Sequence, residues 1–257
     1  MTGEYLAATR TSYDAVAAAY ADQLSDELHG KPLDRALLTP FAEQLHAATP
    51  ARAPAATPAR ASAATPARAS AATPARASAA DRGHAHAART GRPRVWDVGC
   101  GPGHVTAFLA GLGLDAAGID LSGQMVAQAR ARHPDLEFSV GSMTALPAPD
   151  GSWDGLVCFY ALIHMIEDAD VRTALAEFRR VLADGGLLLL AVHAGEEVRH
   201  SEEWFGAKVD VSFRFFDPGW LSAELSRAGF TVEALTRRQP YPDAEVATER
   251  AYFLARI

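Results

Sequence analysis

The stretch Arg94-Val95-Trp96-Asp97-Val98-Gly99-Cys100-Gly101-Pro102-Gly103-His104 decides the fold of this chain. Its first five residues predict a short apolar strand, and a helix is expected to begin at His104. Between them, glycines at alternate positions leave the backbone open to close approach by a ligand. The helix would direct free N–H groups and a partial positive charge at the same loop. We therefore expect a ligand site where this strand passes into its helix.

Strands and helices alternate from Arg94 onward, and this order predicts an α/β fold with a parallel sheet covered on both faces. The predicted strands lie at 94–98, 115–119, 136–140, 153–159, 187–193, 231–237 and 249–256. The predicted helices lie at 104–112, 122–132, 169–182 and 217–228. We expect a polar loop with several aromatic side chains after the strand that ends at His193.

Two amphipathic helices are predicted before the first strand, within residues 4–47. Apolar side chains of the first helix recur at helical spacing between Leu6 and Leu24. The second helix is expected over residues 32–47, because Pro32 suits a first helical turn and an apolar stripe follows it. These helices would add a separate N-terminal layer to the α/β fold.

Residues 48–92 form a low-complexity segment. Three copies of Ala-Thr-Pro-Ala-Arg-Ala-Ser-Ala begin at Ala56, Ala64 and Ala72. A proline in every copy interrupts any helix, and no side chain is suited to a core, so we expect a disordered basic insert. Two interpretations are a repeat expansion tolerated in a surface loop and an arginine tether for an acidic partner. A solenoid is excluded, because its repeats are longer and carry core residues.

The formal net charge of −7 is unevenly distributed. Residues 48–94 hold eight arginines and one acidic residue, which leaves 16 basic and 30 acidic residues, a net charge of −14, in the rest of the chain. The residues outside this segment, with so large a negative charge, would repel phosphate backbones. The charge distribution therefore argues against a nucleic-acid substrate.

Membrane and secretory signals are not evident in the sequence. No apolar run approaches the roughly 20 residues that a membrane span needs, and the first residues do not resemble a secretory signal. The two cysteines, Cys100 and Cys158, are far apart and form neither a disulfide framework nor a zinc pattern. We therefore expect a cytoplasmic protein without bound metal. Its 257 residues fit one globular domain with additions, and they do not indicate an oligomeric state.

The spacing of acidic residues around the glycine loop narrows the choice of ligand. A dinucleotide-binding loop follows the pattern G-x-G-x-x-G, which would require glycine where this chain has His104. Here the pattern is Asp97-x-Gly-x-Gly-x-Gly, and Asp120 lies 21 residues after Gly99 at the end of the second predicted strand. A carboxylate there can accept hydrogen bonds from two ribose hydroxyls. The glycine loop with its two carboxylates suits a ligand with hydroxyls and a positive centre better than a ligand with a pyrophosphate.

These residues resemble motif I of the class I S-adenosylmethionine-dependent methyltransferases. The resemblance extends over residues 94–193. Later signatures of the family match Asp120-Leu121-Ser122-x-x-Met125, Leu146-Pro147, Trp153-Asp154 and Arg180-Val181-Leu182-Ala183-Asp184-Gly185-Gly186. The resemblance, to the small-molecule methyltransferase-11 type, implies a doubly wound, mostly parallel, seven-stranded Rossmann-like sheet with an antiparallel C-terminal strand. It also implies an N-terminal helical lid over 1–47 and the methyltransferase domain over 93–257, on either side of the insert over 48–92.

The resemblance further implies the residues that bind S-adenosylmethionine. Ser142 and Met143 occupy the place where many relatives carry an acidic residue for the adenine amino group. Tyr13 and Tyr20 resemble a lid segment of small-molecule members, and they could equally pack the helix onto the sheet. The full predicted set is Tyr13, Tyr20, Asp97, Gly99, Cys100, Gly101, Gly103, Asp120, Leu121, Met125, Ser142, Met143 and Phe159.

Candidate acceptor-binding residues follow the fourth and fifth strands, because ligands of parallel sheets lie at the carboxyl edge. We expect Tyr160, His164, Arg214 and Phe215 to contact a substrate, with Arg214 either an anion anchor or a solvated loop arginine. His164 and His193 are candidate general bases, since imidazole titrates near neutrality. The alternative for each histidine is a structural role. The aromatic loop could form a pocket wall, a small core or both.

The reaction implied by the resemblance is transfer of a methyl group from S-adenosylmethionine to a small molecule by in-line displacement. Such chemistry requires mainly alignment and exclusion of water. One alternative is a non-catalytic module of the same fold that binds the cofactor or a partner. Another is an RNA methyltransferase that uses the basic insert as an arm, for which deletion of residues 49–89 would abolish activity. A nicotinamide-dependent oxidoreductase is disfavoured by His104.

Overall fold

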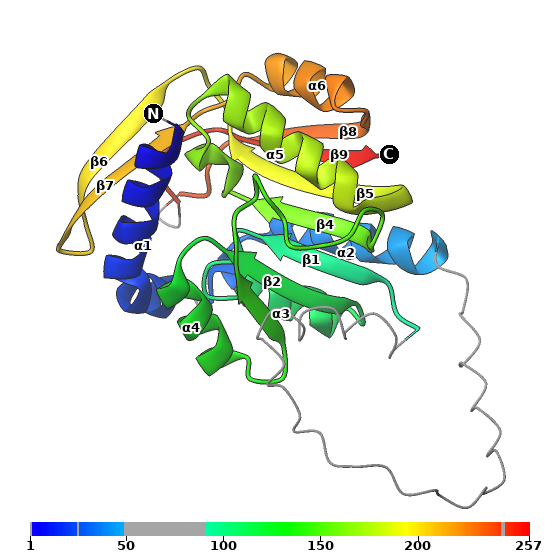
Figure 1. Ribbon diagram of the computed structural model, residues 1–257, viewed down its shortest axis with the longest axis horizontal. Helices are drawn as coiled ribbons and strands as arrows, with labels where there is room; N and C mark the ends of the chain where they lie inside the picture. The colour runs from blue at the N-terminus through cyan, green and yellow to red at the C-terminus, as the bar shows by residue number, and fades with distance from the viewer. Residues whose placement is uncertain (1, 25, 49–90, 243–244) are drawn as a thin grey trace, which may run out of the picture.

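The computed structural model describes residues 2–24, 26–48, 91–242 and 245–257, with side chains from residue 4 onward. Its main feature is a seven-stranded sheet in the order β3-β2-β1-β4-β5-β9-β8 (Figure 1). The strands are β1 (Arg94–Val98), β2 (Asp115–Asp120), β3 (Glu137–Val140), β4 (Trp153–Phe159), β5 (Leu182–His193), β8 (Thr231–Arg238) and β9 (Arg250–Arg256). β9 is antiparallel to both of its neighbours, and the pairs among the first five strands are all parallel. The predicted doubly wound sheet with an antiparallel C-terminal strand is confirmed.

Helices cover both faces of this sheet, as the strand order requires. One face buries the apolar sides of α2 (Pro32–Ala48) and α3 (His104–Gly111), with α4 (Gly123–Arg132) packed beside them on Phe138. The other face buries α5 (Asp168–Val181) and α6 (Pro218–Arg227). The near-continuous apolar run Leu187–Val192 of β5 is buried on both sides, which explains why it lacks polar alternation.

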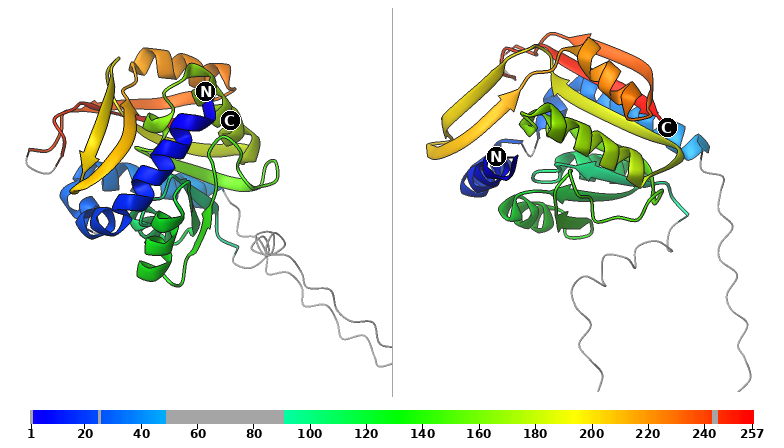
Figure 2. Two further views of the ribbon diagram at one scale, coloured as in Figure 1. Left: turned by 60° about the vertical axis from the view of Figure 1, so that its left-hand side comes forward. Right: turned by 45° about the horizontal axis from the view of Figure 1, so that its top comes forward.

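The two N-terminal helices have different positions. α2 belongs to the core, because Leu38, Phe41 and Leu45 pack against β1, β4 and β5 with at most 2% of their surface exposed. In contrast, α1 (Thr2–Leu24) lies over the carboxyl edge of the sheet, beside α4 and the β6–β7 hairpin (Figures 1 and 2). A short 3₁₀ helix, η1 (Glu27–Gly30), connects them. Only α1 is therefore placed to cover a site.

The predicted polar loop after β5 is an antiparallel hairpin instead. Its strands are β6 (Val198–Trp204) and β7 (Ala207–Arg214). Val209 and Val211 point toward Val16 of α1 and form a small separate core with the neighbouring aromatic rings. The alternation of Val209, Val211 and Phe213 with polar residues is a strand pattern, which the length of the surrounding polar segment obscured.

The boundary between α5 and β5 also differs from the prediction. The helix ends at Val181, and β5 already begins at Leu182, which pairs with Trp153. Gly185-Gly186 was expected to follow the helix, but it lies inside the strand, where Gly185 has a φ of 77°. An irregular register between Trp153 and Gly155 accommodates this bend.

The residues that flank the low-complexity segment lie at the amino edge of the sheet, away from α1 and the hairpin (Figure 1). These are Ala48, which ends α2, and Arg94, which begins β1. The prediction of a disordered insert over 48–92 concerns residues that lie almost entirely outside the described ranges. Within those ranges, no helix combines the length and apolar character that a bilayer span requires.

Candidate functional site

A cavity of about 760 Å³ lies at the carboxyl edge of the sheet. Its walls come from the glycine loop, α1, the ends of β2, β4 and β5, the β6–β7 hairpin and the β8–β9 connection. Most residues singled out from the sequence line it. These are Tyr13, Tyr20, Asp97, Gly99, Cys100, Gly101, Asp120, Leu121, Ser142, Met143, Phe159, Tyr160, His164, His193 and Phe215. The topology therefore brings the two predicted sets of residues around one cavity.

The glycine loop is shaped by three left-handed backbone conformations, with φ of 79° at Gly99, 51° at Gly101 and 86° at Gly103. A Cβ at Gly99 would overlap the Cβ of Ala161, so the loop packs tightly against the segment after β4. At Gly101, a Cβ would instead enter the cavity, 3.9 Å from the ring of Tyr20. Gly101 is therefore the loop position at which the missing side chain leaves room for a ligand.

Asp120 organises the loop from the end of β2. Its Oδ2 accepts a hydrogen bond of 2.9 Å from the N–H of Gly101, and its Oδ1 accepts one of 2.8 Å from the N–H of Ser122. Burial raises the pKa of Asp120 to about 6, although these two N–H groups lower it and the Asp14 carboxylate raises it further. Each carboxylate oxygen keeps a second lone pair for a ligand hydroxyl.

Asp97 is fully buried below the loop. Its Oδ2 accepts a hydrogen bond of 2.7 Å from the hydroxyl of Thr106 on α3. Burial raises the pKa of Asp97 to about 6, against the lowering effect of Thr106 and His104. The carboxylate of Asp97 therefore ties β1 to α3 and also lines the cavity.

The raised pKa values predict a pH dependence of S-adenosylmethionine binding. If Asp120 holds the ribose hydroxyls, as the resemblance implies, binding favours its ionised carboxylate and is expected to be lost as the pH falls through about 6. We expect the dissociation constant to rise roughly tenfold between pH 7 and pH 5. Isothermal titration calorimetry at both pH values measures the dissociation constant. An affinity unchanged over this interval would contradict the prediction that Asp120 holds the ribose.

Helix α1 closes the cavity through specific polar contacts. The Oδ1 of Asp14 accepts hydrogen bonds from the Ser122 hydroxyl at 2.5 Å and from the Gln124 N–H at 3.1 Å, so α1 caps the N-terminus of α4. The rings of Tyr13 and Tyr20 meet edge to face with Trp204 of the hairpin, at centroid distances of 5.6 and 5.2 Å. The two tyrosines therefore line the cavity and also pack the helix on the hairpin, and their role as a lid over the cofactor stays a prediction.

His164 links three elements of this wall. Its Nε2 lies 2.8 Å from the hydroxyl of Tyr13, and its Nδ1 lies 3.1 Å from the carbonyl oxygen of Ser212 on β7. Because a carbonyl oxygen only accepts, Nδ1 carries the proton and Nε2 accepts from Tyr13. Burial lowers the pKa of His164 to about 4. Both ring nitrogens are thus engaged by the protein.

His193 ends β5 on the other side of the cavity. Its ring stacks on Phe215 at a centroid distance of 5.2 Å and lies tilted against Tyr160 at 5.3 Å. Its Nδ1 lies 2.9 Å from the hydroxyl of Thr248. Burial, followed by the neighbouring Arg250, lowers the pKa of His193 to about 4. This half of the cavity is therefore lined by rings around a neutral imidazole.

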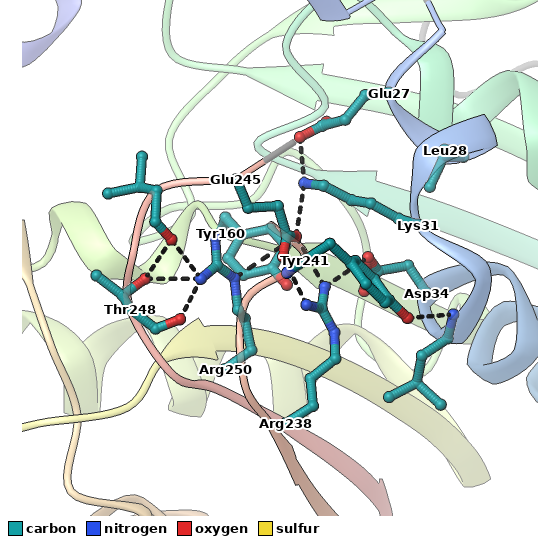
Figure 3. A network of polar contacts seen from close by, with 12 residues as sticks. Glu27, Leu28, Lys31, Asp34, Tyr160, Arg238, Tyr241, Glu245, Thr248 and Arg250 are labelled. Atoms are coloured by element: carbon teal, nitrogen blue, oxygen red, sulfur yellow. Dashed lines mark hydrogen bonds and ion pairs between the residues drawn. The ribbon is translucent and has the colours of Figure 1, made fainter. Parts of the chain in front are cut away.

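Sequence reasoning missed a buried ionic network at the floor of this half (Figure 3). The carboxylate of Glu245 lies 2.6 Å from Arg238, 3.4 Å from Lys31 and 3.6 Å from Arg250. Lys31 also pairs with Glu27, which in turn lies 3.1 Å from His104 beside the glycine loop. The network joins residues 27–34 to residues 238–250, and this association of distant segments could not be predicted from local sequence patterns.

Three predicted site residues do not line the cavity. Arg214 forms an ion pair of 2.7 Å with Asp168 and covers the Trp220 ring, so its placement does not support the anion-anchor hypothesis. Met125 is buried in α4, where its N–H donates to the capping hydroxyl of Ser122. Gly103 is the N-cap of α3, and a Cβ there would collide with the ring of Phe138.

The donor set favours an organic ligand. Among the described residues, no three His, Cys, Asp or Glu side chains group as metal ligands would. Burial raises the pKa of the Cys158 thiol to about 12 and that of Cys100 well above its usual value, so neither is a reactive thiolate. The open glycine backbone, two carboxylates and the ring-lined cavity fit S-adenosylmethionine, which carries ribose hydroxyls, a flat base and a sulfonium.

Comparison with known proteins agrees with this geometry. The family described as "Methyltransferase domain" matches residues 95–186. Demethylmenaquinone methyltransferase of Beutenbergia cavernae is 38% identical over 98 residues, which is 38% of this chain and 40% of that protein. O-methyltransferase cnsE of Penicillium expansum is 32% identical over 154 residues, 55% of this chain and 53% of that protein. The chain thus spans about half or less of the length of these relatives.

Solved structures share the fold. A Burkholderia thailandensis 1,6-didemethyltoxoflavin-N1-methyltransferase, crystallised with 1,6-didemethyltoxoflavin and S-adenosylhomocysteine, covers 100% of this chain and 90% of its own at a TM-score of 0.62 and 20% identity. A Methanosarcina mazei methyltransferase covers 64% of this chain and 92% of its own at a TM-score of 0.59 and 17% identity. Residues 95–186 therefore match a methyltransferase domain, and the chain has the fold of these solved methyltransferases.

Proposed function

We propose that this protein transfers the methyl group of S-adenosylmethionine to a small molecule held in the ring-lined half of the cavity. The observation that carries the proposal is the continuity of the cavity, which joins the Asp120 carboxylate and the glycine loop to Tyr160, His193 and Phe215 without an intervening wall. A donor on the loop and an acceptor among the rings would face each other in one enclosed space. Enclosure excludes water and restricts orientation, the two contributions that methyl transfer needs most.

The residues around the loop would hold the donor. Asp120 would accept hydrogen bonds from the ribose hydroxyls, and Gly99 and Gly101 would allow close approach of the amino-acid portion. Ser142 and Met143, at the end of β3, would border the base, and Phe159 would lie beside it. When bound, S-adenosylmethionine supplies a methyl group that is already activated by the positive sulfur. The chain's own residues therefore contribute alignment rather than activation.

We assign His164 a positioning role. Its two nitrogens hold the Tyr13 hydroxyl and the Ser212 carbonyl, so it joins α1 to the hairpin where they close the cavity. Tyr13 and Tyr20 would then cover the donor as a lid. Asp14, on the same helix, holds this lid against the N-terminus of α4. The low pKa of His164 keeps the ring neutral and preserves both hydrogen bonds at physiological pH.

The ring-lined half suits a small molecule of limited size. Tyr160, Phe213 and Phe215 supply apolar faces, while the cations at its floor, Lys31 and Arg250, are paired with carboxylates. A nucleic acid would need unpaired cations along a groove, whereas Lys31 and Arg250 are paired and α1 and the hairpin border the space on one side. These features support a small-molecule acceptor rather than RNA.

The proposal is tested with donor carrying a labelled methyl group. The purified protein is incubated with the labelled donor and a fractionated metabolite extract, and each fraction is analysed for a labelled product. We expect label in at least one low-molecular-mass fraction and none with the Asp120→Ala variant. Binding of the donor by calorimetry without labelled product in any fraction would favour the non-catalytic module instead.

A further inference from the structure

His193 is connected to a buried arginine through one hydroxyl. The Oγ1 of Thr248 lies 2.9 Å from Nδ1 of His193 and 2.9 Å from Nη1 of Arg250. Thr248 and Arg250 are 6% and 3% exposed, so bulk water does not compete for these contacts. The three side chains therefore form a chain of hydrogen bonds from the charged network to the wall of the acceptor half.

The direction of this chain follows from its donors and acceptors. The guanidinium of Arg250 can only donate, so Thr248 Oγ1 accepts from it. The hydroxyl hydrogen of Thr248 then has two possible acceptors, Nδ1 of His193 at 2.9 Å and the carbonyl oxygen of Val246 at 3.5 Å. That carbonyl already accepts from Arg250 at 2.7 Å and from the Thr248 N–H at 2.8 Å. The hydroxyl hydrogen is therefore directed to Nδ1.

Arg250 is held in this orientation by its surroundings. The two N–H groups of Nη1 are shared among three acceptors, Oγ1 and the carbonyl oxygen of Thr248 and the carbonyl oxygen of Val246, and Nε lies 3.6 Å from the Glu245 carboxylate (Figure 3). Arg238 and Lys31 lie on the same carboxylate. Because arginine keeps its charge at all physiological pH values, the direction of donation does not reverse.

The other groups that face His193 keep its ring neutral. Three cations approach it from different elements, which are Arg250 on β9, Lys31 before α2 and Arg199 on β6. Glu245, in the β8–β9 connection, is the opposing carboxylate and is itself paired with two of these cations. Burial adds to the effect of the cations and lowers the pKa of His193.

We propose that Arg250 and Thr248 are positioning residues that hold His193 as a neutral imidazole with its proton on Nε2, so that His193 donates a hydrogen bond to the methyl acceptor. The location of the acceptor rests on the proposed function. Nε2 is the nitrogen left for the cavity, since Nδ1 is occupied by Thr248 and His193 lines the cavity. A nitrogen that already carries a proton cannot remove one, so this role replaces the general-base hypothesis for His193.

The proposed hydrogen bond defines the chemistry of the acceptor. The molecule must carry an atom that accepts a hydrogen bond, such as a carbonyl oxygen or an unprotonated ring nitrogen, near the atom that receives the methyl group. The receiving atom must also present its lone pair without the help of His193. A molecule that carries only N–H or O–H donors at this position would leave the Nε2 proton unpaired, which is costly in a buried site.

Nuclear magnetic resonance of protein labelled with ¹⁵N in histidine tests the tautomer without any substrate. We expect His193 in the wild-type protein at pH 7 to show a protonated Nε2 and an unprotonated Nδ1. His164 serves as an internal reference, because its contacts demand the opposite tautomer. The His193→Gln variant identifies the His193 signals. A charged ring, or a proton on Nδ1 of His193, would overturn the proposal.

Substitution of Thr248 tests the chain of hydrogen bonds from Arg250 to His193. In Thr248→Val the hydrogen bond to Nδ1 is lost, so we expect the two tautomers of His193 to exchange and its apparent pKa to rise. Thr248→Ser should restore both signatures, and Thr173→Val, at an exposed threonine of α5 outside the cavity, should change neither. If the His193 signals were unchanged in Thr248→Val, Thr248 would not fix the tautomer and the proposal would be refuted. Calorimetry with S-adenosylmethionine on the same samples tests the proposed function separately, since donor binding does not depend on His193.

Discussion

Replacement of Asp120 by alanine is expected to weaken S-adenosylmethionine binding at least about 100-fold. Hydrogen bonds to a charged group contribute about 1.5–3 kcal/mol each, and the substitution removes two such acceptors for the ribose. It also leaves the N–H groups of Gly101 and Ser122 without their carboxylate. The loss therefore combines missing ligand contacts with a loop that is less well ordered.

Calorimetry on matched variants measures this effect. Asp120→Asn keeps the shape of the side chain but offers one carbonyl oxygen, so its affinity should fall between those of the wild type and Asp120→Ala. Asp135→Ala, at an exposed position in the turn before β3, changes the net charge equally and should bind as the wild type does. An Asp120→Ala variant within threefold of the wild type would show that the ribose is held elsewhere.

The second large effect is expected from Gly99→Ala. The new Cβ would overlap the Cβ of Ala161, and the φ of 79° is unfavourable for alanine. Overpacking costs about 1–3 kcal/mol and a left-handed conformation about 1–2 kcal/mol. We expect the free energy of unfolding to fall by about 2–5 kcal/mol and donor binding to be lost, because the loop must move away from the segment after β4.

A compensating substitution separates the two costs. Ala161→Gly removes the atom with which the new Cβ would collide, so Gly99→Ala combined with Ala161→Gly should recover the overpacking part and retain only the conformational part. Denaturant unfolding of the four proteins in this cycle gives the coupling energy. Gly111→Ala, where a Cβ would have free space at the end of α3, is the control. Purely additive effects would contradict the proposed collision.

Much of the sheet and of the donor site could be predicted because its determinants are local. A five-residue strand with three apolar side chains, followed by alternate glycines, specifies the turn from β1 into α3, and Asp97 and Asp120 lie at strand ends next to that turn. Parallel strands bring their carboxyl ends to one edge. Recognising the strands was thus enough to place the loop, Asp120 and Phe159 around a common cavity.

The acceptor half depends on contacts between distant segments. The apolar face of hairpin β6–β7 packs against α1, and this contact between distant segments could not be predicted from the polar segment alone. Arg214 carries the same charge as Arg250, yet one is paired with Asp168 outside the cavity and the other lies inside it beside Glu245. Chain order does not distinguish them, because burial and partner choice are set by packing.

The sequence by itself determined the strands and helices of the main sheet, the glycine loop and its two carboxylates, since each follows from hydrophobic periodicity or from backbone conformations that only glycine adopts easily. Tertiary structure decided how the two histidines are held. The two ring nitrogens of His164 contact Tyr13 and Ser212, while Nδ1 of His193 contacts Thr248. The two rings share the same chemistry, and their different roles arise from neighbours that lie more than 45 residues away along the chain.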